Sequence, residues 1–334
     1  MDIFKKCYDF TRAEKAKEEG IYPYFTEIEK VEGNYVWVDG RKILMVGSNN
    51  YLGLFDEKVI KENIKDVVDH YGSSTCGSRF LNGTYSLHVE LEKKIARFMD
   101  KEDALTFSTG FQTNLGVVSA IAGRNDIIII DRMVHASIID AVRLSYSRIV
   151  KYKHNDMIDL EEKLKILPKN KGKIIVVDGV FSMEGDLSNV PAIVRLAKKY
   201  DARVIVDDAH GIGVMGKNGR GTSEHFGLNG EVDLITATFS KSFASLGGFV
   251  AGDSKVIQYI KHYARSLIFS ASITPAALAA ADKALDIIIN EPQRRERLWE
   301  ITKAMNKELN KMGYHTGNTE TPIIPVFIRD MEKT

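Results

Sequence analysis

The sequence predicts an α/β fold in which helices cover both faces of a mostly parallel β-sheet. Short, nearly continuous runs of apolar and β-branched residues recur between about residues 57 and 280, and amphipathic helical patterns separate most of them. Several runs end in polar side chains, and ligands of such sheets bind beyond the carboxyl ends of the strands. We therefore expect a functional site there. The runs cover residues 127–131, 174–178, 203–207, 233–238 and 249–252.

The chain begins with a segment that we expect to form an arm, residues 1–45. A charged helical pattern occupies residues 11–20, and two short strand patterns follow at 35–38 and 43–46, separated by a glycine-containing turn. The alternating pattern then fills a large domain, expected at residues 46–290.

A smaller domain is expected to begin at residue 291. One helical pattern covers residues 276–290, a second runs from Pro292 to about residue 312, and residues 322–328 are typical of a strand. Residues 291–334 therefore resemble the start of an α+β domain that this sequence does not complete.

The composition excludes several classes of protein. The chain has 334 residues, of which 44% are hydrophobic and 27% charged, and its net charge of +1 gives no electrostatic reason to expect a nucleic acid as a partner. The two cysteines, Cys7 and Cys76, indicate a reduced, cytoplasmic protein without disulfides. No metal-ligand spacing occurs, and no run approaches the roughly eighteen apolar residues of a membrane span. Peripheral membrane contact stays open.

Lys241 is the first candidate for a catalytic residue. It follows a strand pattern, and burial at a strand end lowers the pKa of a lysine and makes its amine nucleophilic. The hydroxyls of Thr238 and Ser240 suit a phosphate beside that amine. An upstream strand pattern ends in Asp207 and His210. An imine-forming lysine and a carboxylate for a pyridinium nitrogen are what pyridoxal 5′-phosphate (PLP) most needs, whereas a lysine on a solvated loop is the competing interpretation.

Two further segments suit a cofactor. Residues 107–113 join a strand pattern to a helix pattern, and backbone N–H groups at a helix start form an anion cradle. Simple capping by Ser108 or Thr109 is the alternative explanation. His135 also lies just after a strand end, where its flat ring would either stack on a planar cofactor or make only local bonds.

The pattern G-x-G-x-x-G occurs at residues 211–216, but we do not interpret it as a dinucleotide site. That motif must open a helix, and here the turn-rich segment 217–221 follows. The glycines instead suit a tight loop beside the cofactor. The segment 47–53 either forms only a turn or supplies side-chain amides that orient a substrate carboxylate. The glycine- and hydroxyl-rich loop at 72–83 is expected to line the site.

Taken together, these residues resemble those of the α-oxoamine synthases, a family of fold-type I PLP enzymes. The resemblance runs from about residue 8 to the end and is strongest toward bacterial serine palmitoyltransferases, on the segments 8–13, 22–25, 152–157 and 238–248. It implies the PLP-transferase fold type I. The large domain would hold a mostly parallel seven-stranded sheet in three α/β/α layers, beside a small, truncated C-terminal domain. It also implies a homodimer with shared active sites.

The resemblance also implies a role for each site residue. Lys241 would bind PLP as an imine, Asp207 would keep the ring nitrogen protonated, and His135 would stack on the ring and contact the substrate. His210, with Ser182 beside it, would bond the phenolic oxygen. The catalytic set is therefore Lys241, His135, Asp207 and His210. The phosphate would be held by Gly110, Phe111, Thr238 and Ser240, together with Ser270 from the partner subunit.

The implied reaction is a decarboxylative condensation. L-serine is the favoured amino acid, and its condensation with a long-chain acyl-CoA would release CoA and CO₂ and give a 3-keto sphingoid base. Asn49 would help to place the amino-acid carboxylate. Family members normally carry an arginine for that carboxylate beyond the end of this sequence, so we expect weak amino-acid binding unless Asn49 or Arg79 replaces it.

Three alternatives stay open. A synthase of the same family would use glycine, alanine or cysteate, as in enzymes of the 2-amino-3-ketobutyrate CoA ligase or 8-amino-7-oxononanoate synthase type. A non-catalytic subunit with the PLP fold is the second alternative, although such subunits typically lack the lysine found here at position 241. A dinucleotide-dependent oxidoreductase, based on residues 211–216, is the third.

Overall fold

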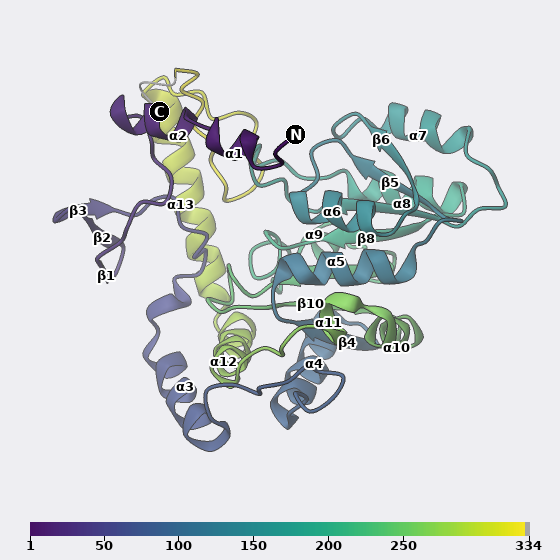
Figure 1. The fold of residues 1–334 in the computed structure, drawn as a ribbon, viewed down its shortest axis with the longest axis horizontal. Helices are drawn as coiled ribbons and strands as arrows, with labels where there is room; N and C mark the ends of the chain where they lie inside the picture. The colour runs from purple at the N-terminus through teal and green to yellow at the C-terminus, as the bar shows by residue number, and fades with distance from the viewer. Residues whose placement is uncertain (331–334) are drawn as a thin grey trace.

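A seven-stranded sheet forms the centre of the molecule in the computed structural model, which describes residues 1–330 (Figure 1). Strands β9, β8, β7, β5 and β6 lie side by side and run parallel, whereas β10 runs antiparallel to both of its neighbours, β4 and β9. The strands are β4 (Asp103–Phe107), β5 (Ile127–Asp131), β6 (Arg148–Tyr152), β7 (Lys173–Asp178), β8 (Arg203–Asp207), β9 (Leu234–Thr238) and β10 (Gly248–Gly252). The predicted mostly parallel, seven-stranded sheet is confirmed.

Helices cover both faces of this sheet because successive residues of a strand point to opposite sides. In β5, Ile127 and Ile129 belong to one apolar cluster, and Ile128 and Ile130 belong to another. The first cluster includes residues of α4 (Ser86–Met99), α7 (Met157–Lys165), α8 (Val190–Lys199) and α12 (Pro275–Asn290). The second includes residues of α5 (Gly110–Ile121), α6 (Ala136–Leu144), α10 (Ser254–Tyr263) and α11 (Arg265–Ile268). The three-layer α/β/α arrangement is therefore confirmed.

The N-terminal arm lies to one side of the large sheet (Figure 1). It consists of α1 (Lys5–Tyr8), α2 (Arg12–Glu18) and an antiparallel sheet of β1 (Lys30–Glu32), β2 (Tyr35–Val38) and β3 (Arg41–Leu44). The strand predicted at residues 43–46 begins two residues earlier. Asp39 and Gly40 both have positive φ and form a two-residue hairpin turn, so pairing starts at once with Val38 opposite Arg41.

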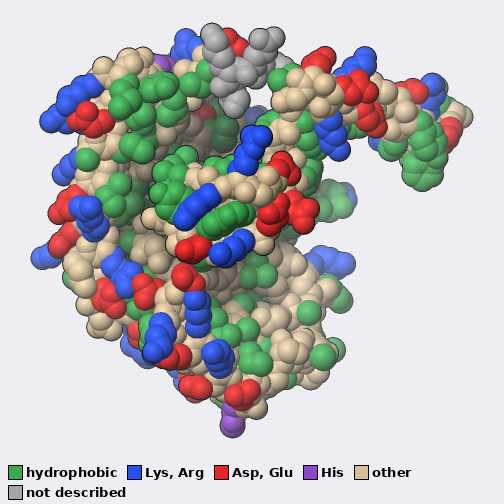
Figure 2. All heavy atoms as spheres, turned by 90° about the vertical axis from the view of Figure 1, so that its left-hand side faces the viewer, with side chains coloured by type: hydrophobic (Ala, Val, Ile, Leu, Met, Phe, Trp, Pro, Cys, Tyr) green, Lys and Arg blue, Asp and Glu red, His purple; other side chains and the backbone are tan. Residues whose placement is uncertain are grey.

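The short elements and the C-terminal helices complete the fold. The 3₁₀-helix η1 (Leu54–Asp56) leads into α3 (Lys58–Tyr71), which packs against α12, and α9 (Thr222–His225) follows the glycine-rich loop. Helix α13 (Pro292–Lys311) begins at a proline directly after α12. On the face that carries α13 and the arm, side chains of both charges are interspersed (Figure 2). Within residues 1–330, no helix is both long enough and apolar enough to cross a membrane.

The strand predicted at residues 322–328 does not form. Among the described residues, no neighbouring strand is available to pair with this segment, and a strand exists only as part of a sheet. The chain instead bonds to the loop after β7, since the hydroxyls of Thr319 and Thr321 donate to the carbonyl of Gly185 at 3.0 and 2.8 Å. The predicted domain boundaries at residues 45 and 290 stay predictions.

A buried ion pair anchors the loop between α3 and α4 to the sheet. The guanidinium of Arg79 donates to both carboxylate oxygens of Glu92, at 2.6 and 3.0 Å, and to Thr106 on β4 at 2.8 Å. Arg79 and Glu92 are both buried. The donors of Arg79 are thereby committed within the protein, so the suggestion that Arg79 binds a substrate carboxylate is not supported by its position.

We expect Glu92→Leu to destabilise the fold by about 3–5 kcal/mol, because it leaves the buried guanidinium of Arg79 without its counter-charge. Urea denaturation followed by circular dichroism measures this change. The matched control is Glu62→Leu, whose partner Lys58 is exposed, and its expected cost is within about 0.5 kcal/mol. Equal effects of the two substitutions would contradict an anchoring role for the buried pair.

Candidate active site

A cavity of about 270 Å³ lies at the carboxyl ends of β7, β8 and β9, and we call it the strand-end cavity. Its walls come from these strand ends, from the start of α5 and from the β5–α6 connection. It brings together every predicted cofactor residue except Ser270. These lining residues are Gly110, Phe111, His135, Ser182, Asp207, His210, Thr238, Ser240 and Lys241.

Strand pairing places two carboxyl groups next to each other in this cavity. Asp178 ends β7 and pairs in register with Asp207, which ends β8. Burial, and then the negative charge of Asp207, raise the pKa of Asp178 well above its usual value. The backbone N–H of His135 also donates to Asp178 at 3.0 Å. Burial at this strand end thus favours the protonated form of Asp178 over its charged form.

Lys241 lies in the loop between β9 and β10, residues 239–247. The loop is closed by a backbone hydrogen bond from Phe239 N–H to the Gly247 carbonyl, at 2.9 Å, and it rests on the buried rings of Phe239 and Phe243. Burial lowers the pKa of Lys241, although Asp207 and Asp178 act in the opposite direction. Within residues 1–330 its amine makes no hydrogen bond or ion pair, which leaves it available for chemistry.

The start of α5 lies at the strand-end cavity, where the anion cradle was predicted. The hydroxyl of Thr109 caps the helix by accepting from the N–H of Gln112 at 3.0 Å, and the first N–H groups of a helix have no partner within it. A Cβ atom at Gly110 would lie 2.7 Å from the Cβ of Thr238, so only glycine allows β9 to approach this closely. The hydroxyls of Thr238 and Ser240, 2.8 Å apart, complete the polar rim.

His210 is held by a tyrosine that the sequence analysis did not single out. The hydroxyl of Tyr51 and Nδ1 of His210 are 2.7 Å apart. Burial, and then the positive charge of Lys241, lower the pKa of His210 to about 3, while burial raises the pKa of Tyr51. Both groups are therefore neutral at physiological pH. Tyr51 lies within the segment 47–53, but nothing in the sequence indicates a contact with a residue 159 positions away.

Asn49 and Ser270 do not lie in the strand-end cavity. Asn49 lines a second cavity of about 580 Å³, the arm cavity, which shares Ser240 and Lys241 with the first. Its other walls come from apolar and small polar residues of the N-terminal arm and its connection, and from Ala244. Lys241 thus separates the two cavities. Ser270 follows α11 and accepts a hydrogen bond from Gln112 of its own chain at 3.1 Å. Its predicted role in a partner's site stays a prediction.

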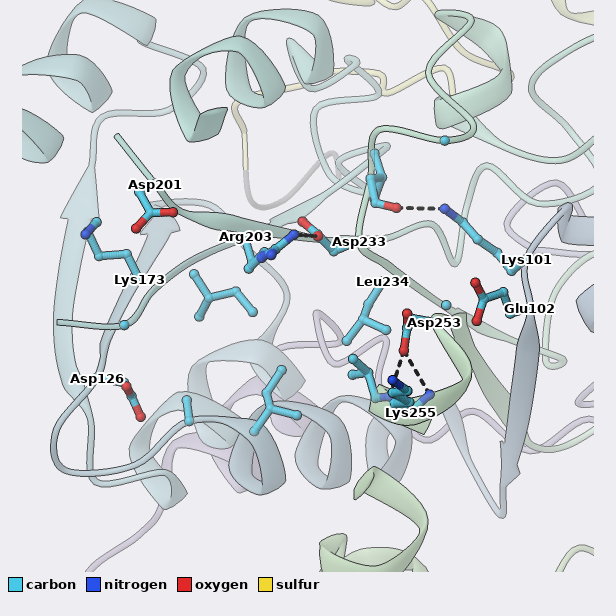
Figure 3. Close-up of a pocket in the computed structure, with 18 of the residues that line it drawn as sticks. Lys101, Glu102, Asp126, Lys173, Asp201, Arg203, Asp233, Leu234, Asp253 and Lys255 are labelled. Atoms are coloured by element: carbon cyan, nitrogen blue, oxygen red, sulfur yellow. Dashed lines mark hydrogen bonds and ion pairs between the residues drawn. The ribbon is translucent and has the colours of Figure 1, made fainter. Parts of the chain in front are cut away.

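A larger cavity, of about 1040 Å³, lies at the opposite edge of the sheet, where β7, β8 and β9 begin (Figure 3). Its charged side chains largely serve the fold. Arg203 pairs with Asp233 at 2.8 Å, Asp253 caps α10, and Lys101 donates to two backbone carbonyls at 2.7 Å. None of the predicted site residues lines it, and ligands of parallel sheets bind at the other edge. We therefore take the strand-end cavity as the active site.

The glycine-rich segment 211–216 forms turns and does not open a helix. Gly213 has a φ of +82°, and a Cβ atom there would lie 2.8 Å from the Cβ of Ser242 in the Lys241 loop. The glycines allow two loops to pack closely, as expected, and the dinucleotide interpretation has no structural support.

Comparison with known proteins gives the family. A family model described as aminotransferase class I and II matches residues 41–333. The chain belongs to the aminotransferase class I and II family. This family membership agrees with the fold and with the strand-end position of the site.

Within the aminotransferase class I and II family, the chain is similar to two named groups. Serine palmitoyltransferase of Sphingobacterium spiritivorum is 53% identical over 332 residues, which cover 99% of this chain and 83% of that protein. The 8-amino-7-oxononanoate synthase of Thermosipho melanesiensis is 44% identical over 328 residues, 98% of this chain and 83% of the relative. A serine palmitoyltransferase structure from S. paucimobilis with PLP and myriocin bound has a TM-score of 0.96 at 34% identity, covering 100% of this chain and 88% of that one. The resemblance to the α-oxoamine synthases is confirmed.

The lowered pKa of His210 makes stability depend on pH. In the unfolded chain a histidine binds a proton below about pH 6.5, whereas folded His210 does so only near pH 3. The unfolded state therefore holds the extra proton between these values, and the stability contribution falls as pH drops through this window. Between pH 7 and pH 5 the free energy of unfolding of the original protein should fall because of His210. In His210→Asn this fall should be smaller by about 1–2 kcal/mol. Urea midpoints at both pH values test this, and parallel losses would contradict it.

Proposed function

We propose that this chain is a PLP-dependent acyltransferase that condenses L-serine with a long-chain acyl-CoA and releases CoA and CO₂ to give a 3-keto sphingoid base. The observation that carries the proposal is the meeting of three features in one cavity: the amine of Lys241, the carboxylate of Asp207 and the anion cradle at Gly110. The named relatives support the choice of serine and a palmitoyl-type acyl group.

The lining residues fit PLP. Its phosphate suits the start of α5, where Gly110 leaves the helix N-terminus without a side chain. The hydroxyls of Thr238 and Ser240 lie beside this position and suit the same group. Its pyridinium nitrogen suits the carboxylate of Asp207, and its phenolic oxygen suits neutral His210 and Ser182. Lys241 supplies the amine for attachment. When bound, PLP provides the electron sink that stabilises negative charge on the α-carbon of an amino acid.

The side chains of this site divide the remaining chemistry among them. Burial lowers the pKa of Lys241 and so favours its unprotonated amine, and the group that would hold the cofactor could therefore also accept the substrate's α-proton. Asp207 would be the partner of the protonated ring nitrogen. Asp207 is buried, so water has little access to its carboxyl group.

The arm cavity supports the assignment of the two substrates. It meets the strand-end cavity at Lys241, and its walls include apolar side chains suited to an acyl chain, whereas Asn49 is a polar group suited to a carboxylate. The apolar wall residues are Ile28, Val31, Val36, Met45 and Phe55. We propose that the amino acid and the acyl-CoA both reach Lys241 from this side.

We also propose that two copies of the chain form a dimer and share their active sites. Ser270 lies outside the cavity of its own chain, and the neighbouring Phe269 is 73% exposed. An exposed ring of this size beside a polar group suits a subunit interface. Sedimentation velocity measures the dimer. Activity restored by mixing Ser270→Ala with Lys241→Ala subunits would support shared sites, and a monomeric active protein would contradict them.

A synthase of the same family with another amino acid is the second candidate function. The relative named 8-amino-7-oxononanoate synthase supports it. Mass spectrometry of the product decides between the candidates when palmitoyl-CoA is offered with serine, glycine, alanine or cysteate in turn. We expect the serine product to dominate, with Lys241→Ala as the inactive control. A dominant product from another amino acid would assign the chain to that synthase type, and the presence of Lys241 argues against a non-catalytic subunit.

Lys241→Ala should bind PLP without forming an imine, because the variant has no amine at the end of β9. We expect the visible absorption band of the protein-bound imine to disappear, and borohydride treatment to leave no PLP attached to the chain. Retention of the band, or of a borohydride-stable adduct, would assign the attachment to another lysine. Lys101→Ala, whose amine bonds to backbone carbonyls at the opposite edge, is the matched control.

The two adjacent carboxyl groups should respond differently to the same neutral substitution. Asp207→Asn removes the charge that holds the ring nitrogen protonated, so exchange of the substrate's α-proton with deuterated solvent should fall by about a hundredfold or more. Asp178→Asn replaces a group whose pKa burial raises well above its usual value, and we expect exchange within about threefold of the original protein. Equal losses in the two variants would contradict this division of charge.

A further inference from the structure

A branched chain of buried hydrogen bonds links the two cofactor-facing residues Asp207 and His135. The side-chain amide of Asn114 donates to Asp207 at 2.6 Å and to the hydroxyl of Ser137 at 2.9 Å, while the hydroxyl of Thr236 donates to the amide oxygen at 2.8 Å. The hydroxyl of Ser137 lies 2.7 Å from Nδ1 of His135. Asn114, Ser137 and Thr236 are at most 3% exposed.

The direction of each bond at Asn114 follows from its neighbours. An ionised carboxylate only accepts hydrogen bonds, so the NH₂ group of Asn114 faces Asp207 and its oxygen faces Thr236. The second amide hydrogen then goes to Ser137. Both donors and the oxygen of the amide are thereby used, which explains how an amide can lie on the same buried side of α5 as Val117 and Val118.

The direction of the last bond sets the state of His135. The hydroxyl of Ser137 accepts from Asn114, so its own hydrogen is left to donate to Nδ1 of His135. The backbone N–H of Ser137 also donates to Nδ1, at 3.2 Å. A nitrogen that accepts two hydrogen bonds carries no hydrogen itself, and the ring hydrogen therefore lies on Nε2. Within residues 1–330, Nε2 has no hydrogen-bond partner.

We propose that Asn114 is a positioning residue that orients Asp207 and, through Ser137, fixes His135 in the Nε2–H tautomer. His135 thereby presents a hydrogen-bond donor, and not an acceptor, from the wall of the strand-end cavity. The tautomer follows from the hydrogen bonds around Ser137 alone, whereas its effect on condensation rests on the proposed function. In that reaction Nε2–H of His135 would donate to an oxygen of the substrate. The tautomer of His135 would then depend on Asn114, which also contacts Asp207.

The tautomer is tested by NMR on protein labelled with ¹⁵N at its 8 histidines. Long-range ¹⁵N–¹H spectra distinguish a protonated from an unprotonated ring nitrogen, and the His135 signals are those that disappear in His135→Gln. We expect His135 to be in the Nε2–H form, both in the PLP-loaded protein and after cofactor removal. The Nδ1–H form should become more populated in both Ser137→Ala and Asn114→Leu. Ser137→Ala removes the hydroxyl that donates to Nδ1, and Asn114→Leu removes the amide that orients this hydroxyl. Original protein in the Nδ1–H form, or variants without a shift, would overturn the proposal.

Kinetics provide the second arm. Ser137→Ala should lower kcat for condensation by about tenfold, the loss expected for one hydrogen bond, with the KM for serine changed less than threefold. Ser137→Thr keeps the hydroxyl and should restore most of kcat. The control is Ser145→Ala, which removes another buried hydroxyl that donates to Val142 and accepts from the N–H of Ser147 near the end of α6, and we expect both readouts to stay unchanged.

Each failure has a separate meaning. A variant that fails to fold loses all of its histidine dispersion, and Ser137→Ala then replaces Asn114→Leu as the deciding variant. The NMR result decides the tautomer even if no amino acid gives a condensation product, which would count against the proposed function alone. A normal kcat in Ser137→Ala with a shifted tautomer would overturn the link between this hydrogen-bond chain and catalysis.

Discussion

The structure of the active site depends on one constraint, a negative charge held at the buried carboxyl end of a parallel sheet. Pairing of β7 with β8 places Asp178 beside Asp207, and burial there raises the pKa of Asp178 well above its usual value. The carboxyl group of Asp207 accepts hydrogen bonds from inside the protein, from the amide of Asn114 and from the backbone N–H of Ala209. The same burial lowers the pKa values of Lys241 and His210. One environment therefore favours an unprotonated amine at Lys241 and a neutral imidazole at His210, next to the carboxyl group of Asp207.

Much of the fold and the site followed from local patterns. Strand β5 is a run of four isoleucines with its ends as predicted, and the site residues at strand ends meet because parallel strands share a direction. Strand β6 was missed because it lies at the sheet edge, where Arg148 and Lys151 interrupt its apolar pattern. The segment 322–328 has strand-like composition, but composition cannot supply a pairing partner.

The residues that sequence reasoning missed act at a distance in the chain. Asn114 and Tyr51 are each a single polar side chain in a segment that is otherwise unremarkable, and their partners lie 93 and 159 positions away. Their only local signal is a polar residue where the helical pattern of α5 expects an apolar one, or a tyrosine in a loop. Long-range hydrogen bonds of this kind can be identified only from the three-dimensional structure. A lysine after a buried strand, in contrast, can be recognised as a candidate catalytic residue from the sequence.

The loop that carries Lys241 also limits how such a protein can diverge. Residues 239–247 join β9 to β10, which lie side by side, and both ends of the loop are tied by backbone bonds over a floor of phenylalanine rings. An inserted residue would move the amine away from Asp207 or open the seam between two central strands. The hairpin tip at Asp39 and Gly40 lies at the surface of the arm and has no such neighbours. Length variation in this fold is thus tolerated least in the lysine loop and most in the arm, where it would reshape the second cavity and leave the amine of Lys241 in place beside Asp207.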